Sequence, residues 1–129
     1  MQTYLTMHAL IKYRDKYLIL QRADHRSNPG YWNCVTGHIK ERETGEEAAI
    51  REVKEETNLD AKITKTAEPL IHFTKDQRWI ILAYLLETDD ISDMKIDENE
   101  SKDFKWIERN DEMVSEYKGL EETFRVLGI

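Results

Sequence analysis

The stretch GHIKERETGEEAAIREVKEETNL, from Gly37 to Leu59, decides the fold of this chain. Within it, Thr44 and Glu47 stand three residues apart, which is the spacing of a capping box at a helix N-terminus. The sequence therefore predicts a helix that begins after Thr44 and runs to about Thr57.

The predicted helix has two unlike flanks. At about 100° per residue, Glu52, Glu55 and Glu56 fall within one sector of the helix surface. The adjoining sector holds Ala49, Ile50, Val53 and Thr57. We expect the second flank to pack in the core and the first to carry a cluster of carboxylates.

The clustered carboxylates need a compensating charge. Glu52 and Glu56 stand at i and i+4, where like charges cost about 0.2–0.5 kcal/mol on an isolated helix. A divalent cation offsets such repulsion, and Mg²⁺ is commonly held by a few carboxylates together with substrate phosphates. Arg51, one turn before Glu55, can orient that carboxylate through a charge-assisted hydrogen bond.

The spacing of these residues resembles the signature of the Nudix hydrolases, G-x5-E-x7-R-E-U-x-E-E-x-G-U, in which U is aliphatic. Gly37, Glu43 and the run from Arg51 to Leu59 match eight of its nine defined positions. If the matched identities are independent, chance agreement is on the order of one in a million per starting position. The resemblance implies an α/β/α sandwich around a mixed β-sheet, formed by a single domain over residues 1–129.

The one departure from the signature is Asn58, which stands where the family has glycine. That position needs a left-handed backbone, and asparagine is the next most tolerant residue there. We therefore expect the fold to survive with a loss of about 0.3–1 kcal/mol relative to glycine.

The resemblance also implies a metal site and a catalytic set. Mg²⁺, or Mn²⁺ in its place, would be held by Glu52, Glu55 and Glu56, with the Gly37 carbonyl as a further ligand. The catalytic set adds Arg51 and Glu100 to these glutamates. Glu52, Glu56 and Glu100 are alternative general bases. Glu100 resembles a family glutamate that precedes a late strand with a tryptophan, and Glu98 is the competing choice.

Four further residues are candidate substrate contacts by the same resemblance: Arg22, Trp32, His38 and Lys40. Each has an ordinary structural alternative. The two basic residues would otherwise be solvated, the tryptophan would belong to the core, and the histidine would be structural.

The composition argues against several other classes of protein. The chain has 129 residues, of which 40% are apolar and 35% charged, as in a soluble globular protein. A net charge of −7 argues against sequence-independent nucleic-acid binding. Without a long apolar run or a basic leader, we expect no membrane span and no secretory signal. The lone Cys34 excludes an internal disulfide, and a reducing cytoplasm is the expected location.

Apolar runs and turn residues predict the remaining elements. Strands are expected over residues 2–11, 17–22, 32–40, 60–66, 70–75, 79–87 and 104–107, with 79–87 as a central strand. Asn110 is expected to cap a last helix that Gly119 interrupts. The acidic run 88–103 reads as a solvated loop unless it brings Glu100 to the site.

The reaction implied by the resemblance is hydrolysis of a nucleoside diphosphate linked to a group X. The segment WNCVTG, residues 32–37, resembles the W-x-x-V-T-G segment of bacterial dihydroneopterin triphosphate pyrophosphatases, which also accept nucleoside triphosphates. An oxidised-dGTP hydrolase is the next candidate. The alternative of another class is a catalytically weak Nudix-fold module that binds nucleotide or regulates. Neither nucleic acid nor membrane is an expected partner, and a monomer or a homodimer is expected.

Overall fold

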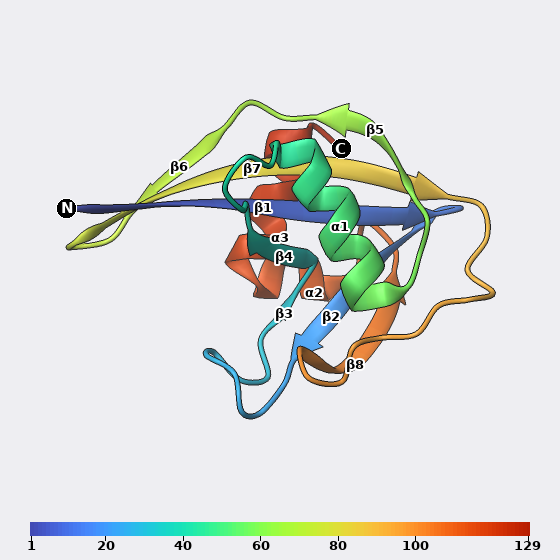
Figure 1. The fold of residues 1–129 in the computed structure, drawn as a ribbon. Helices are drawn as coiled ribbons and strands as arrows, with labels where there is room; N and C mark the ends of the chain where they lie inside the picture. The colour runs from blue at the N-terminus through green and yellow to red at the C-terminus, as the bar shows by residue number, and fades with distance from the viewer.

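The computed structural model describes residues Met1 to Ile129. A mixed β-sheet lies between α1 (Gly45–Thr57) on one face and α2 (Glu112–Glu116) and α3 (Lys118–Leu127) on the other (Figure 1). This three-layer arrangement confirms the predicted α/β/α sandwich. The strands are β1 (Gln2–Tyr13), β2 (Lys16–Arg22), β3 (Trp32–Asn33), β4 (Val35–His38), β5 (Lys62–Thr66), β6 (Leu70–Phe73), β7 (Gln77–Thr88) and β8 (Ser101–Ile107).

The centre of the sheet is a long parallel pair. β1 and β7 pair over their whole length, from Gln2 opposite Gln77 to Tyr13 opposite Thr88. β5 and β6 both pair with the outer edge of β7, so β7 is a central strand as predicted. On the other side, β4 and β2 pair antiparallel with β1, and β3 and β8 pair with β2. In Figure 1 the N-terminal part of β1 extends beyond the helices together with β6 and β7.

Strand alternation divides the core into two halves. Met7, Ala9 and Ile11 of β1 pack on the α1 side with Val53 of the helix. Leu10 faces the other way and packs with Phe124 of α3. Because successive side chains of a strand point to opposite faces, a single strand serves both helix layers.

Helix α1 begins as the sequence predicts. Thr44 accepts a hydrogen bond from the Glu47 backbone N–H at 3.1 Å, and the Glu47 carboxylate accepts one from Thr44 N–H at 3.0 Å. The helix face is rotated from the expected one, however. Ile50 is 51% exposed, while Glu56 lies with the buried residues at 8%. Positions 49, 53 and 56 are spaced as one stripe of a helix, so Glu56 shares the stripe that packs inward.

Four other expectations at element ends are corrected. The strand predicted over 32–40 is two short strands, β3 and β4, and β8 begins at Ser101 rather than Phe104. Asp111, not Asn110, caps α2, because its side chain accepts from Met113 N–H at 2.9 Å. Gly119 lies inside the first turn of α3, and the break between the helices is at Tyr117, whose backbone is extended.

Asn58 ends α1 in the left-handed conformation, with φ 58° and ψ 21°, as expected for the position where the family has glycine. Its Nδ2 also donates to the Asp93 carbonyl at 2.9 Å. We predict that Asn58→Gly changes the free energy of unfolding by less than about 1 kcal/mol. Glycine adopts the left-handed backbone with less strain, and this gain offsets the loss of the hydrogen bond to Asp93. Asn58→Ala loses the hydrogen bond and puts a residue that disfavours the left-handed backbone at this position, so it should lower stability by about 1–2 kcal/mol. Urea denaturation of the three proteins checks this ordering, and equal losses in both variants would contradict it.

The acidic connector between β7 and β8 is tied to the end of α1. Lys95 N–H donates to the Thr57 carbonyl and Asp97 N–H to the Glu56 carbonyl, both at 2.9 Å. Ile91, Met94 and Ile96 pack against the α1 half of the core. These contacts fix the path by which the connector reaches Glu100.

Candidate active site

A cleft of about 570 Å³ opens beside the C-terminal half of α1. Its walls come from β1, β2, β4, β7, the loop between β2 and β3, α1 and the end of the acidic connector. Nine of the residues singled out from the sequence line it: Arg22, Gly37, His38, Lys40, Arg51, Glu52, Glu55, Glu56 and Glu100. These nine residues come from four separate segments of the chain and meet at one opening.

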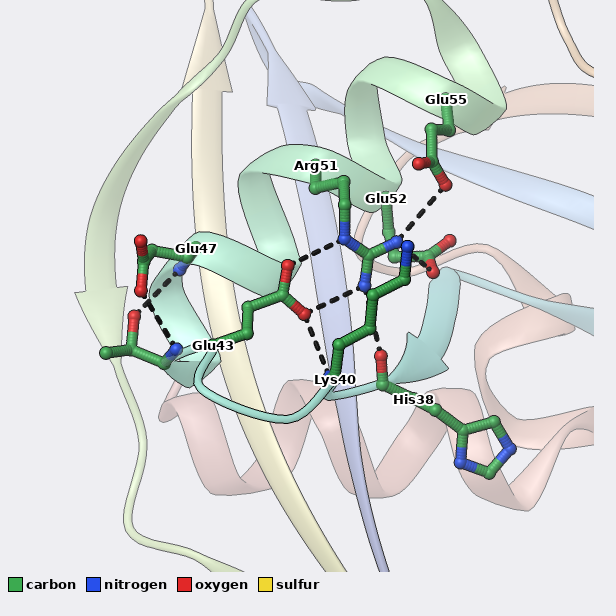
Figure 2. A network of polar contacts seen from close by, with 8 residues as sticks. His38, Lys40, Glu43, Glu47, Arg51, Glu52 and Glu55 are labelled. Carbon is green, nitrogen blue, oxygen red and sulfur yellow. Dashed lines mark hydrogen bonds and ion pairs between the residues drawn. The ribbon is translucent and has the colours of Figure 1, made fainter.

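Arg51 connects four acceptors at the rim of the cleft (Figure 2). Its guanidinium makes two hydrogen bonds to Glu43, with Nε to Oε2 at 2.7 Å and Nη2 to Oε1 at 2.9 Å. Nη1 donates to Glu52 at 2.9 Å and to Glu55 at 3.2 Å. Nη2 also donates to the His38 carbonyl at 3.2 Å. Arg51 thus holds Glu55 as expected, and it joins the helix to the end of β4.

Glu43 has a structural task in this arrangement. The Arg51 hydrogen bonds, and a further one from Lys40 N–H at 3.0 Å, lower the pKa of Glu43 to about 2. A carboxylate held by such charge-assisted bonds stays ionised at any physiological pH. Glu43 is therefore the anchor of Arg51, which explains why the signature requires it eight residues earlier.

Gly37 lies directly under the Glu52 carboxyl group. A Cβ atom added at Gly37 would meet Glu52 Cδ at 2.6 Å, so the Glu52 side chain would have to move. Glycine thus allows the Glu52 carboxyl group to lie against the backbone at this position, and a larger residue would displace it.

Glu56 is the least ordinary member of the cluster. Its carboxyl is buried, and Oε2 has no hydrogen-bond partner in the protein. Burial first, and then the neighbouring Glu52, raise the pKa of Glu56 far above the usual value for a glutamate. A buried carboxyl oxygen without a partner is costly, and a cation beside it would remove that cost.

The donor set fits a hard divalent cation, because carboxylate and carbonyl oxygens are the ligands that Mg²⁺ prefers. The cage is not already assembled: no three His, Cys, Asp or Glu side chains are arranged to hold a metal. Two of these carboxylates are paired with Arg51, Glu52 at 2.9 Å and Glu55 at 3.2 Å.

Glu100 faces the same cleft from the connector, between two arginines. Its Oε2 lies 3.8 Å from Arg22 Nη1 and 3.4 Å from Arg26 Nη2. Arg22 is further fixed by the loop, since its Nε donates to the Ser27 carbonyl at 3.0 Å. Glu98, the competing choice, is exposed and does not line the cleft. Arg26 was not singled out from the sequence, where a basic residue in a loop gives no signal of its own.

Trp32 lies elsewhere, and its expected contact with substrate is corrected. It is 7% exposed, belongs to the α3 half of the core and does not line the cleft. Lys105 Nζ lies over its ring, 5.2 Å from the centroid. Trp32 is therefore a core residue, which was the alternative to a substrate contact, because it points from β3 toward the terminal helices. The aromatic rings that line the cleft are those of Tyr31 and Trp79, with two histidines, His8 and His38. That Trp79 and His8 line the cleft could have been predicted only from the strand register.

The NUDIX domain family matches this chain over residues 5–125. The chain therefore belongs to that family, in agreement with the spacing of its signature and the position of α1. None of its helices has the length and apolar character needed to cross a membrane.

Relatives with assigned activities match a shorter segment. The dihydroneopterin triphosphate diphosphatase of Escherichia coli (strain K12) is 49% identical over 45 residues, which are 35% of this chain and 28% of that enzyme. The enzyme of the same name from Haemophilus influenzae is 43% identical over 53 residues, or 41% of this chain and 32% of the enzyme. The matched segments thus span less than a third of these relatives.

Solved structures share the fold over almost the whole chain. The MutT protein from Methanosarcina mazei superposes with a TM-score of 0.77 at 22% identity, covering 96% of this chain and 88% of that one. The E. coli dihydroneopterin triphosphate pyrophosphohydrolase gives 0.73 at 21% identity, covering 98% of both chains. At such identities the likeness concerns the fold.

Proposed function

We propose that this protein is a Mg²⁺-dependent pyrophosphohydrolase that cleaves nucleoside diphosphates linked to a group X. Its preferred substrates would be a (deoxy)nucleoside triphosphate or dihydroneopterin triphosphate, with the monophosphate and pyrophosphate as products. The observation that carries the proposal is the buried, unpartnered Oε2 of Glu56 beside Glu52, in a cleft that also holds arginines. A carboxylate pair in that setting would suit a divalent cation, which would neutralise charge on a phosphate chain in the cleft.

Glu52, Glu55 and Glu56 would hold Mg²⁺, or Mn²⁺, with the Gly37 carbonyl as a further ligand. Such an ion supplies charge neutralisation on the phosphate oxygens and makes a nearby water more acidic. Arg51 would keep Glu52 and Glu55 in position through its anchor on Glu43. Arg22 and Lys40 would neutralise charge on the phosphate chain, and His38 would lie beside it. Glu52, Glu56 and Glu100 are the candidate general bases, since all three line the cleft.

The triphosphate preference rests on two similarities. The WNCVTG segment resembles the equivalent one of dihydroneopterin triphosphate pyrophosphatases. The relatives from E. coli and H. influenzae carry that activity in their names. Hydrolysis of oxidised dGTP is the next candidate substrate. The single cysteine is free and buried, which suits the reducing cytoplasm that we propose as its location.

One observation favours a second function, a Nudix-fold module that binds nucleotide with little turnover. Arg51 already holds two of the three metal-site glutamates, and no metal cage is preformed. If carboxylates paired with Arg51 bind a cation only weakly, nucleotide would bind with little cleavage.

Mg²⁺ titration against pyrophosphate release separates these functions. With GTP as substrate, we expect release to rise with Mg²⁺, to saturate, and to stop in EDTA. Glu55→Gln should lower kcat by about 10²–10³-fold, because one charged ligand is lost. Glu98→Gln, an exposed glutamate outside the cleft, is the matched control and should be unchanged. Turnover that ignores both Mg²⁺ and Glu55→Gln would exclude the metal-dependent mechanism. Nucleotide binding without any release would favour the binding module.

A further inference from the structure

His8 lies on the part of the cleft wall formed by β1, on the sheet face that α3 partly covers. Its side chain is half-buried, and its Nδ1 lies 2.9 Å from Thr123 Oγ1 of α3. Thr123 is almost fully buried, at 2% exposure, so water does not compete for its hydroxyl group. The proposed chemistry at the carboxylates gives neither residue a task.

The protons of this contact can be assigned from the partners of Thr123. Its Oγ1 donates to the Gly119 carbonyl one turn earlier, at 2.9 Å. A hydroxyl group has one proton and two acceptor lone pairs, so with that proton in use it can only accept from His8. The Cys34 thiol contacts the same hydroxyl, and burial raises the pKa of Cys34 to about 12, so the thiol stays protonated beside it. On these contacts the ring proton of His8 is assigned to Nδ1.

The other ring nitrogen, Nε2, is then left as a hydrogen-bond acceptor. It has no partner in the protein and is not among the buried polar atoms that lack one, so solvent in the cleft reaches it. Burial lowers the pKa of His8 to about 4, and the ring is neutral at physiological pH. A neutral imidazole with a fixed tautomer presents one acceptor and no donor on its free side.

We propose that His8, held as the Nδ1–H tautomer by Thr123, selects substrates whose heterocycle offers an N–H donor. His8 is thus a specificity-determining residue, and Thr123 is its positioning residue. This inference rests on the proposed function, because it assumes that the heterocycle of the triphosphate enters the cleft beside β1. A ring that carries an amino or ring N–H group would pair with Nε2. A ring without one would strip water from Nε2 and leave the acceptor unpaired.

The tautomer is tested first, without turnover. ¹⁵N NMR of the histidine rings distinguishes a protonated Nδ1 from a protonated Nε2. We expect His8 to be in the Nδ1–H form in the unaltered protein and in Thr123→Ser, which keeps the hydroxyl. Thr123→Val has nearly the same shape without the hydroxyl and should shift His8 toward the Nε2–H form. A wild-type His8 with Nε2 protonated would overturn the inference.

Specificity is tested with a matched pair of substrates. GTP has N–H donors on its six-membered ring, whereas purine riboside triphosphate has none and carries the same triphosphate. We expect wild type and Thr123→Ser to prefer GTP in kcat/KM, chiefly through KM. His8→Phe should reduce that preference about five- to tenfold, which is the value of one hydrogen bond. Thr123→Val should reduce it in part.

The outcomes separate this inference from the proposed function. An unchanged preference in His8→Phe, with normal turnover, would overturn the role of His8 alone. If neither nucleotide is hydrolysed, and dihydroneopterin triphosphate is not hydrolysed either, the proposed function fails. Binding of the two nucleotides in EDTA, followed through the His8 ¹⁵N shifts, then decides the inference. Equal affinities and equal shifts for both nucleotides would overturn it.

Discussion

Glu56→Gln is expected to abolish pyrophosphate release and, at the same time, to make the metal-free protein more stable. The carboxyl is buried with one oxygen unpartnered, and burial raises its pKa far above that of an exposed glutamate. Folding at neutral pH therefore has to protonate Glu56 or bury its charge, and glutamine avoids both. We expect a gain of roughly 2–4 kcal/mol in EDTA and a loss of at least about 10³-fold in kcat.

The pH dependence of unfolding gives the sign of this effect independently. A carboxyl whose pKa is raised on folding contributes stability that is present below about pH 4.5 and is lost as pH rises. His8 acts oppositely: burial lowers its pKa in the folded protein to about 4, below the ordinary histidine pKa of 6.5, so its contribution to stability is lost as pH falls through that interval. In EDTA, the two slopes of about 1.4 kcal/mol per pH unit should nearly cancel between pH 4.5 and 6.5. Above pH 6.5, stability should fall in wild type and not in Glu56→Gln.

Thermal unfolding in EDTA from pH 5 to 9, with pyrophosphate release measured in Mg²⁺, checks both parts. Glu98→Gln removes one exposed negative charge and serves as the control for net charge. A Glu56→Gln protein that is less stable than wild type at pH 8 would show that the Glu56 carboxylate is satisfied in the metal-free fold.

The second large effect is expected for Arg51→Lys. One guanidinium bonds Glu43 twice and also reaches Glu52, Glu55 and a carbonyl of β4. A lysine keeps the charge but cannot span these acceptors, because its three donors radiate from one atom. We expect kcat to fall about 10²–10³-fold as Glu52 and Glu55 lose their positions, and stability to fall by about 1–3 kcal/mol.

Kinetics at saturating Mg²⁺ and urea denaturation measure the two effects of Arg51→Lys. Arg42→Lys is the matched control, since Arg42 is exposed in the preceding turn and lines no part of the cleft. Full activity in Arg51→Lys would mean that charge alone, without the fork of hydrogen bonds, organises the carboxylates.

The features predicted correctly from the sequence are those fixed by local spacing. The cap at Thr44 and the left-handed Asn58 follow from contacts within a few residues. Gly37, Arg51 and Glu52 come together because the signature links the end of one strand to the helix that follows it. The cleft-lining residues in these segments could therefore be predicted without knowing how the rest of the sheet is arranged.

The features that were missed depend on tertiary contacts. In α1, Ile50 lies at the surface and Glu56 is buried, the reverse of what was expected. The packing of the helix against the sheet determines which of its faces is buried, and the helix sequence alone does not. Trp32 went to the core and His8 to the cleft through the strand register, which one sequence does not reveal. Asp111 caps α2 in place of Asn110. Both residue types are good N-caps, so the position of the cap depends on where the backbone turns into the helix.

The parallel pairing of β1 with β7 also bears on how the chain acquires its structure. Every residue of β1 pairs with one 75 positions further along, from 2 with 77 to 13 with 88. During synthesis the first strand must wait, without its main partner, while the whole segment that carries α1 emerges. Closing so long a loop is entropically costly before any contact rewards it, so we expect slow folding limited by this step. The ability to hydrolyse substrate should therefore appear last on refolding, together with the docking of these two strands.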